Sequence, residues 1–250
     1  MKKIVIIGGA GTVGKQLVNG LRKHHHEITV IDQHNIFQSK TEIDFIQADA
    51  TNLQELMEKV PKADVLINLL NTETKHALED VDTFEKMTSI FFKSTYYLLY
   101  TANQKNIQKV IFASTNHVTD CYEDEGKSIL GREITVKDYP CSNSLYGVLK
   151  FASEQVGALF SKEERLSVIN IRIGSVPKDV TKEEIEKNDR LKHTLLTDTD
   201  LIALFQAAIE SDVIFGTYYG VSDNIGKPWD MENAKKELGY KSEENTSDIL

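Results

Sequence analysis

Tyr146 and Lys150 are the residues whose types and spacing point most directly to chemistry. They lie four positions apart, so on a helix both side chains share one face. A free tyrosine has a pKa of about 10 and is a poor base near neutral pH. A lysine ammonium one turn away stabilises the phenolate, so this spacing predicts a tyrosine with a lowered pKa that removes a proton from a hydroxyl group.

Thr115 offers a third polar group. It follows the apolar residues 110–113, which predict a buried strand, and its hydroxyl would orient a substrate oxygen while Tyr146 takes the proton. Hydride would then pass to a bound cofactor. The alternative is that Tyr146 and Lys150 belong to an ordinary half-exposed helix face, but their place after a dinucleotide-type turn favours catalysis.

That turn occupies residues 8–14, between the apolar run 4–7 and a helix-periodic stretch. Gly8 would permit the tight turn, Gly11 the approach of a pyrophosphate, and Gly14 the close packing of helix on strand. Free N–H groups at the helix start, at Thr12 and Val13, would bind the phosphates. A tight turn without a ligand is the alternative.

Acidic and small residues end the next predicted strands. Asp32 ends the strand at 27–31, about 20 residues beyond the glycines, where a carboxylate binds the adenosine ribose. It would repel a 2′-phosphate, so we expect NAD rather than NADP. Asp49 would either meet the adenine amino group or cap a turn. Ala50 and Leu69 complete the expected cofactor-binding set.

Strand and helix signals alternate along the whole chain. This order predicts a Rossmann-type doubly wound α/β fold, a parallel sheet with helices on both faces and a small C-terminal substrate-binding part. Ligands then bind outside the carboxyl ends of the strands. We expect strands at 4–7, 27–31, 43–47, 64–68, 110–113, 167–171 and 213–215, and helices at 53–59, 80–103, 144–160 and 199–210. In the helix at 80–103, the core-facing stripe would be Phe84, Met87, Phe91, Thr95, Leu98 and Ala102.

Composition limits the partners. The 250 residues suit a single domain over 1–250, and the 29 basic and 38 acidic residues give a net charge of −9, which disfavours nucleic acid and anionic membranes. No apolar stretch approaches the ~18 residues of a membrane span, so we expect a soluble protein. Cys121 and Cys141 are too few for a disulfide framework, which indicates a reducing cytoplasm. The histidines at 24–26 would be solvated, and we expect no metal site.

Together these motifs resemble an extended short-chain dehydrogenase/reductase of the NAD-dependent epimerase/dehydratase family. Within that family the chain is most similar to uronate dehydrogenases and related sugar dehydrogenases. The matching segments are 8–14, Asp32, Asp49, 112–117, 145–150, 170–175, 219–224 and 229–230.

The resemblance implies NAD-dependent oxidation of a hydroxyl on a small sugar or sugar acid. Tyr146 would be the base, Lys150 its electrostatic partner and a ribose ligand, and Thr115 the substrate orienter. Substrate-binding elements would lie mainly in 116–140 and 172–230. The resemblance also implies substrate contacts from Asn116, His117 and Arg172, with Arg172 pairing a carboxylate. Alternatively, Asn116 would cap a turn, His117 would pack under the loop, and Arg172 would bridge to an acidic side chain.

Three departures from the family pattern leave other functions open. Leu69, Leu70 and Asn71 stand where small residues are usual, Phe91 replaces a usual asparagine, and Thr115 replaces a serine. A nucleotide-sugar epimerase/dehydratase that retains its NAD is the second interpretation. A dinucleotide-binding regulatory protein without turnover is the third. The sequence also leaves open a homodimer.

Overall fold

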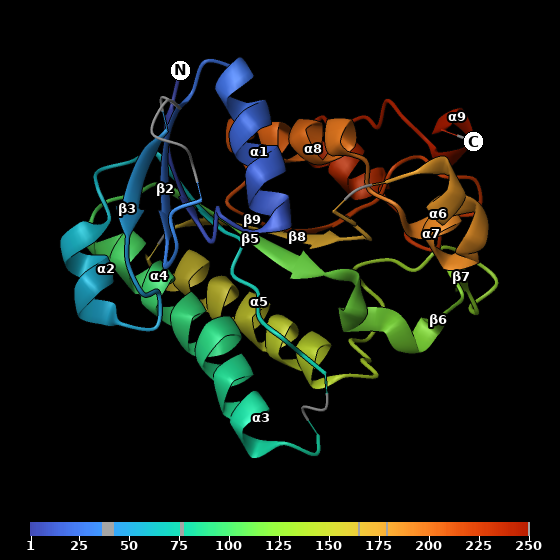
Figure 1. The fold of residues 1–250 in the computed structure, drawn as a ribbon, viewed down its shortest axis with the longest axis horizontal. Coiled ribbons are helices and arrows are strands. Elements are labelled where there is room, and N and C mark those ends of the chain that lie inside the picture. The colour runs from blue at the N-terminus through green and yellow to red at the C-terminus, as the bar shows by residue number, and fades with distance from the viewer. Residues whose placement is uncertain (37–42, 76–77, 165, 179, 250) are drawn as a thin grey trace.

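The fold is centred on one seven-stranded parallel sheet (Figure 1). The computed structural model describes residues 1–250 apart from 37–42, 76–77, 165, 179 and 250. The strand order is β3-β2-β1-β4-β5-β8-β9. The strands are β1 (Lys3–Ile7), β2 (Glu27–Asp32), β3 (Asp44–Gln47), β4 (Val65–Asn68), β5 (Lys109–Thr115), β8 (Ser167–Ile173) and β9 (Phe215–Gly220). This order confirms the predicted Rossmann-type fold.

Helices cover both faces of the sheet, as Figure 1 shows. One face carries α1 (Thr12–Lys23), α8 (Asp198–Glu210) and η3 (Ala234–Leu238), and the other carries α2 (Leu53–Lys59), α4 (Ser94–Gln104) and α5 (Leu145–Glu164). In β1, Ile4 and Ile6 pack toward the first group, whereas Val5 and Ile7 pack toward the second. Both faces of the strand are therefore buried, which explains its unbroken apolar run.

A smaller part of the chain lies beyond the carboxyl ends of β5 and β8, at the right of Figure 1. It contains η2 (Asn116–Tyr122), the hairpin β6 (Glu123–Asp124) and β7 (Lys127–Ser128), α6 (Lys182–Lys187), α7 (Asp189–Thr194) and α9 (Thr246–Ile249). An apolar cluster of Ile134, Tyr219, Val221 and Trp229 forms the core of this part. Since Tyr219 belongs to β9, the sheet and the smaller part share a core.

The helix predicted over 80–103 is interrupted. It consists of α3 (Val81–Met87), the π-helical η1 (Thr88–Lys93) and α4. Met87, Phe91, Thr95, Leu98 and Ala102 are buried as predicted, but Phe84 is 41% exposed. A π-helical insertion adds about one residue and so turns the preceding helix by roughly 100° relative to the rest. Phe84 is therefore carried off the core face.

The last strand also differs from its prediction, because β9 begins at Phe215 and runs to Gly220. Gly216 and Gly220 weaken the strand signal of this segment, while Tyr218 and Tyr219 are its fully buried side chains. Within the described residues, no helix has the length and apolar character needed to cross a membrane.

Candidate active site

The glycine turn between β1 and α1 has the geometry that its sequence predicts. Gly8 has φ +79°, and a Cβ there would lie 3.0 Å from the backbone of Leu69. A Cβ on Gly14 would lie 2.5 Å from Gly9 Cα, so the helix packs directly on the turn. Gly11 is the N-cap of α1 and provides no side-chain cap, which leaves the N–H groups of the first turn, including Thr12 and Val13, suited to a phosphate.

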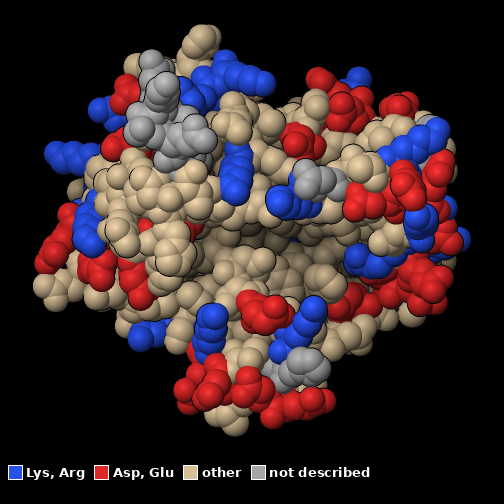
Figure 2. All heavy atoms as spheres, viewed as in Figure 1, with Lys and Arg blue, Asp and Glu red and all other residues tan. Residues whose placement is uncertain are grey.

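A groove passes this turn along the carboxyl ends of the first strands. Its lining includes Gly8, Gly11, Asp32, Asp49, Ala50, Leu69, Leu70 and Asn71. Figure 2 shows this face of the molecule hollowed at its centre, with charged side chains mostly around the rim. The cofactor-binding residues predicted from several strands thus meet in one groove, and their chemistry fits a dinucleotide.

The two acidic residues of the groove also support local structure. Asp32 Oδ2 accepts a hydrogen bond from the N–H of Ala10 at 3.0 Å. Asp49 Oδ1 accepts from the N–H and the hydroxyl of Thr51, both at 2.8 Å. Burial raises the pKa of Asp49, but these bonds outweigh it, so the net pKa is lowered. Asp49 therefore holds a turn, and it does so within the groove.

Thr115, Tyr146 and Lys150 come together where β5 ends and α5 begins. The Thr115 hydroxyl hydrogen-bonds Tyr146. Lys150 Nζ donates to the carbonyl of Ala113 at 2.8 Å and of Leu70 at 3.3 Å. It also lies 5.8 Å from the centre of the Tyr146 ring. The residues of the predicted catalytic set thus lie together, and Leu70, which lines the groove, accepts a hydrogen bond from Lys150.

The predicted lowering of the Tyr146 pKa is wrong for this structure. Burial raises the pKa of the phenol, and the hydrogen bond with Thr115 opposes this only in part. Burial likewise lowers the pKa of Lys150 to about 7, against the attraction of Glu154. The Lys150 ammonium is directed at two carbonyls rather than at the phenol oxygen, so the phenolate gains little from it.

Phe91 of η1 covers this set from the helix side. Its ring centre lies 5.1 Å from that of Tyr146 in an edge-on arrangement, and Lys150 Nζ lies 4.9 Å above the Phe91 ring. The ring contributes a cation–π contact and excludes water from the ammonium. The departure noted at this position in the sequence therefore shapes the surroundings of both Tyr146 and Lys150.

Asn116 and His117 follow Thr115 in η2. Asn116 is buried, and its side-chain Nδ2 has no hydrogen-bond partner among the described residues. His117 Nδ1 lies 2.8 Å from Asp120 Oδ2, and its ring centre is 5.8 Å from that of Tyr146. A buried donor without a partner is costly unless a ligand or water satisfies it. Asn116 thus has a buried donor with no partner among the described residues, and His117 lies beside Tyr146.

Arg172 adopts the alternative role considered from the sequence. Its guanidinium is 3% exposed and makes a bidentate ion pair with Glu154, at 2.9 and 2.7 Å. It also donates to the Tyr219 hydroxyl, which bonds Thr119 of η2 at 2.7 Å. Burial alone would lower the pKa of Arg172, but Glu154 raises it overall. Arg172 thus braces the strand ends and η2 and does not face the open part of the site.

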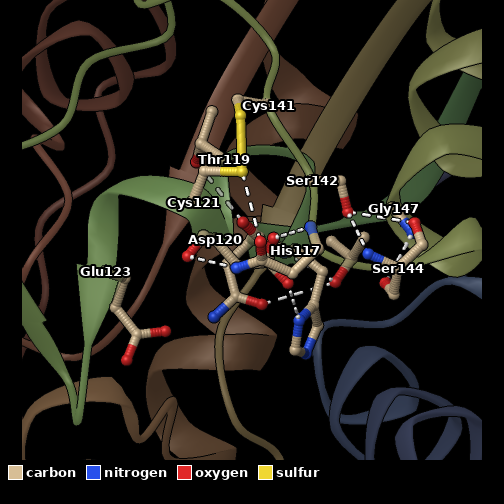
Figure 3. Close-up of polar contacts among 12 residues, drawn as sticks. His117, Thr119, Asp120, Cys121, Glu123, Cys141, Ser142, Ser144 and Gly147 are labelled. Atoms are coloured by element: carbon tan, nitrogen blue, oxygen red, sulfur yellow. Dashed lines mark hydrogen bonds and ion pairs between the residues drawn. A yellow bond between two sulfur atoms is a disulfide. The ribbon is translucent and has the colours of Figure 1, made fainter.

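The structure joins the two cysteines that the sequence analysis placed in a reducing setting. Cys121 of η2 and Cys141, just before α5, form a disulfide with a Cα–Cα distance of 5.5 Å (Figure 3). Asn143 adds to this junction, because its N–H and its side chain bond Asp120 at 2.6 and 3.1 Å. The loop carrying His117 is therefore tied to the start of the helix carrying Tyr146.

A second pocket begins beyond His117. Its lining is His117, Asp120, Glu123, Glu125, Asn143, Lys187, Asn188, Asp189 and Arg190. Sequence reasoning assigned η2 and its surroundings to substrate binding but did not identify Glu123, Asn143 or Arg190. They come from three separate segments, and no spacing relates them. For Glu154 a signal existed, because it lies one helical turn after Lys150.

The fold and site define a Rossmann-type protein with the motifs of a short-chain dehydrogenase/reductase. The NAD dependent epimerase/dehydratase family matches residues 4–177, and the chain belongs to this family.

Relatives extend over the whole chain. The uncharacterized protein YtbQ of Bacillus subtilis is 49% identical over 251 residues, covering 100% of this chain and 97% of its own. L-arabinose 1-dehydrogenase (NAD(P)(+)) of Haloferax volcanii is 22% identical over 263 residues and is matched over 100% of both chains. The crystal structure of glucuronic acid dehydrogenase from Chromohalobacter salexigens superposes with a TM-score of 0.83 at 22% identity, covering 100% of this chain and 89% of that one.

Proposed function

We propose that the protein is an NAD-dependent dehydrogenase that oxidises a hydroxyl group of a small sugar or sugar acid. The observation that carries this proposal is the meeting of Thr115, Tyr146 and Lys150 next to the dinucleotide-type groove. The relatives include an L-arabinose dehydrogenase and a glucuronic acid dehydrogenase, so a neutral sugar and a sugar acid are both candidate substrates.

Each residue of the set has a task in this reaction. Tyr146 takes the hydroxyl proton, and Thr115 holds the phenol and the substrate oxygen in line. Lys150 holds its donors toward the groove and, 5.8 Å from the centre of the Tyr146 ring, adds only weakly to the charge at the phenol. NAD, when bound, accepts the hydride. Asn116 donates its free side-chain N–H to the substrate, and His117 supports the substrate from the pocket beyond.

We propose NAD rather than NADP as the cofactor. The carboxylate of Asp32 lies at the end of β2 and lines the groove, where it would accept from ribose hydroxyls and repel a 2′-phosphate. The Gly11 end of α1 would hold the pyrophosphate. These assignments place the adenosine half over β1 and β2 and the reactive half toward Leu69 and Tyr146.

Replacement of the base tests the proposal. Wild type should reduce NAD, seen as absorbance of the reduced nicotinamide, with at least one member of a panel of aldoses and uronates. Tyr146→Phe should lower this rate at least 10²-fold, because general-base catalysis contributes about 10²–10⁴-fold. NAD binding measured by calorimetry should persist. Tyr96→Phe on the outer side of α4 is the matched control and should keep full activity. Turnover that survives Tyr146→Phe would reject the mechanism.

Dinucleotide binding without turnover is a second candidate function, favoured by one specific observation. Burial raises the pKa of Tyr146, and Lys150 is engaged by two carbonyls under the Phe91 ring. A phenol in this state is a weak base. Calorimetric binding of NAD, together with no hydride transfer across the whole substrate panel, would establish this function in place of the first.

A further inference from the structure

The charge of the substrate is the property on which the pocket beyond His117 bears most directly. A sugar acid or sugar phosphate bound next to Tyr146 needs a cation to balance its anionic group. Among the described residues, Arg190 and Lys187 line this pocket, and Arg172 is the cation that the sequence analysis assigned to a substrate carboxylate. The partners of each therefore indicate which substrates the site accepts.

None of these three cations is without an acidic partner. Arg172 is buried against Glu154 and does not line the pocket. Arg190 is bound by Glu123, with Nε 3.1 and 3.2 Å from the two carboxylate oxygens and Nη2 2.9 Å from Oε2. Lys187 pairs with Glu183 on the exposed side of α6. The pair of Arg190 with Glu123 is the firmer of the two pocket pairs, because the Glu123 side chain is only 5% exposed.

Glu123 is itself held in place from its own hairpin. Its Oε1 accepts a hydrogen bond from the N–H of Gly126 at 2.5 Å. Gly126 has φ +84°, and a Cβ there would lie 2.9 Å from the carbonyl oxygen of Arg190, so the hairpin packs directly against α7. The carboxylate and the guanidinium therefore stay together without any substrate.

The remaining charges of the pocket are mostly negative. Its lining has four carboxylates, from Asp120, Glu123, Glu125 and Asp189, against the two cations Lys187 and Arg190. His117 is bonded to Asp120 and is directed toward that carboxylate. Acidic and basic side chains are mixed at this end of the molecule in Figure 2. Among the lining residues that the structure describes, carboxylates therefore outnumber cations, although Asp189 also pairs with Lys192 outside the lining. The better buried of the two lining cations, Arg190, is already engaged by Glu123.

We propose that Glu123, by holding Arg190, makes the site select an uncharged sugar over a sugar acid or a sugar phosphate. This inference rests on the proposed function, since it concerns the substrate of the same site. Glu123 is a specificity-determining residue in two ways: its carboxylate repels an anionic substrate, and its ion pair keeps Arg190 from binding one. Repulsion of a competing ligand is a common source of specificity. The hydroxyl groups of a neutral sugar can instead bond Asn116, Asn143 and the pocket carboxylates.

Matched pairs of substrates provide the test. We would measure hydride transfer to NAD with galactose against galacturonate and with glucose against glucuronate and glucose 6-phosphate. Wild type should favour the neutral member at least tenfold in kcat/KM. Glu123→Gln should raise the ratio of uronate to neutral activity at least tenfold, because it releases Arg190. A wild-type preference for the uronates would overturn the proposal.

Two further variants separate the pair from the general charge. Glu125→Gln removes one negative charge from the same pocket lining but leaves the Glu123–Arg190 pair intact. The ratio of uronate to neutral-sugar activity should therefore change less than threefold in this variant. The double variant Glu123→Gln/Arg190→Gln should lack the increase in relative uronate activity that Glu123→Gln shows, because the released cation is absent. If Glu123→Gln and Glu125→Gln changed the ratio of uronate to neutral-sugar activity equally, the proposed role of Glu123 would be overturned. If Glu123→Gln does not fold, Glu123→Asp, which loosens the pair, should show a smaller shift in the same direction.

Binding measurements keep this inference distinct from the proposed function. Calorimetry with NADH present would measure the affinity of wild type for galactose and galacturonate. Tighter binding of the neutral sugar without any hydride transfer would contradict the dehydrogenase proposal and support the selectivity. Tighter binding of the uronate would overturn the selectivity, whatever the turnover. Binding of neither saccharide would overturn both.

Discussion

Lys150 combines a positive charge with nearly complete burial. Its ammonium is satisfied by two carbonyls and lies over the rings of Phe91 and Phe112, at 4.9 and 4.8 Å. Glu154, the nearest carboxylate along the helix, is already committed to Arg172. Burial thus lowers the pKa of Lys150 to about 7, and its Nζ lies 5.8 Å from the centre of the Tyr146 ring.

The ionisation of Lys150 should be visible in the pH dependence of stability. Burial lowers its pKa from 10.5 to about 7. Between these values the unfolded chain binds a proton that the folded chain has released, so the free energy of unfolding should rise with pH from about 7 upward. Guanidinium denaturation of wild type and Lys150→Met at several pH values from 6 to 10 would measure this.

The difference between the two stability curves is the informative quantity. Burial also lowers the pKa of Lys109, to about 8. Its effect on the pH dependence of stability is the same in both proteins, so it cancels in the difference between their curves. The stability of wild type relative to Lys150→Met should increase as the pH rises above about 7, and the difference should be constant at lower pH. Parallel curves over the whole range would show that Lys150 is not destabilised as an ammonium.

At the scale of elements, the turn between β1 and α1 separates packing from ligand binding. A Cβ on Gly14 would overlap the Gly9 backbone at 2.5 Å, whereas a Cβ on Gly11 would meet only Gly8 O, at 3.5 Å. Gly14→Ala should therefore lower the free energy of unfolding by roughly 1–3 kcal/mol or more. Gly11→Ala should cost less than about 1 kcal/mol yet weaken NAD binding at least tenfold.

Chemical denaturation and calorimetric titration of these two variants would check this assignment. The pair is matched, since each adds one methyl group to the same turn. If Gly11→Ala bound NAD as tightly as wild type, the phosphates would not lie against Gly11. If Gly14→Ala were as stable as wild type, the helix would not depend on its close approach to Gly9.

Local patterns predicted most of these elements, and packing decided the rest. The strands β1, β2 and β4 and the turn at Gly8 follow from residues adjacent in sequence. The exposure of Phe84 depends on the π-helical turn, which no hydrophobic period signals. The Cys121–Cys141 disulfide and the Arg172–Glu154 pair depend on which segments meet in space. Their residue types alone were compatible with other roles.

At the scale of the whole molecule, the central sheet connects the dinucleotide groove to the smaller part around the second pocket. β9 pairs with β8 along its length and contributes Tyr219, which stacks on Trp229 with ring centres 5.8 Å apart. The Tyr219 hydroxyl also accepts a hydrogen bond from Arg172 and forms another with Thr119. The smaller part is thus built onto the sheet rather than joined to it by a linker.

This continuity should make unfolding a single transition. Trp229 is the only tryptophan in the sequence, and it is fully buried in the smaller part. Its fluorescence therefore reports on that part, whereas far-ultraviolet circular dichroism reports on all helices and strands. The two signals should give the same denaturant midpoint, as expected for one cooperative domain. An earlier fluorescence midpoint would show that the smaller part unfolds on its own.

The bond between Asp32 and Ala10 has a consequence for engineering the cofactor preference. Exchange of this carboxylate for a small or basic residue is the direct way to admit a 2′-phosphate. Here it would also remove the acceptor for the Ala10 N–H, which lies inside the glycine turn. Asp32→Asn keeps an acceptor oxygen and removes the charge. A redesign for the phosphorylated dinucleotide should therefore start from the amide, because it changes the recognition without reshaping the phosphate cradle.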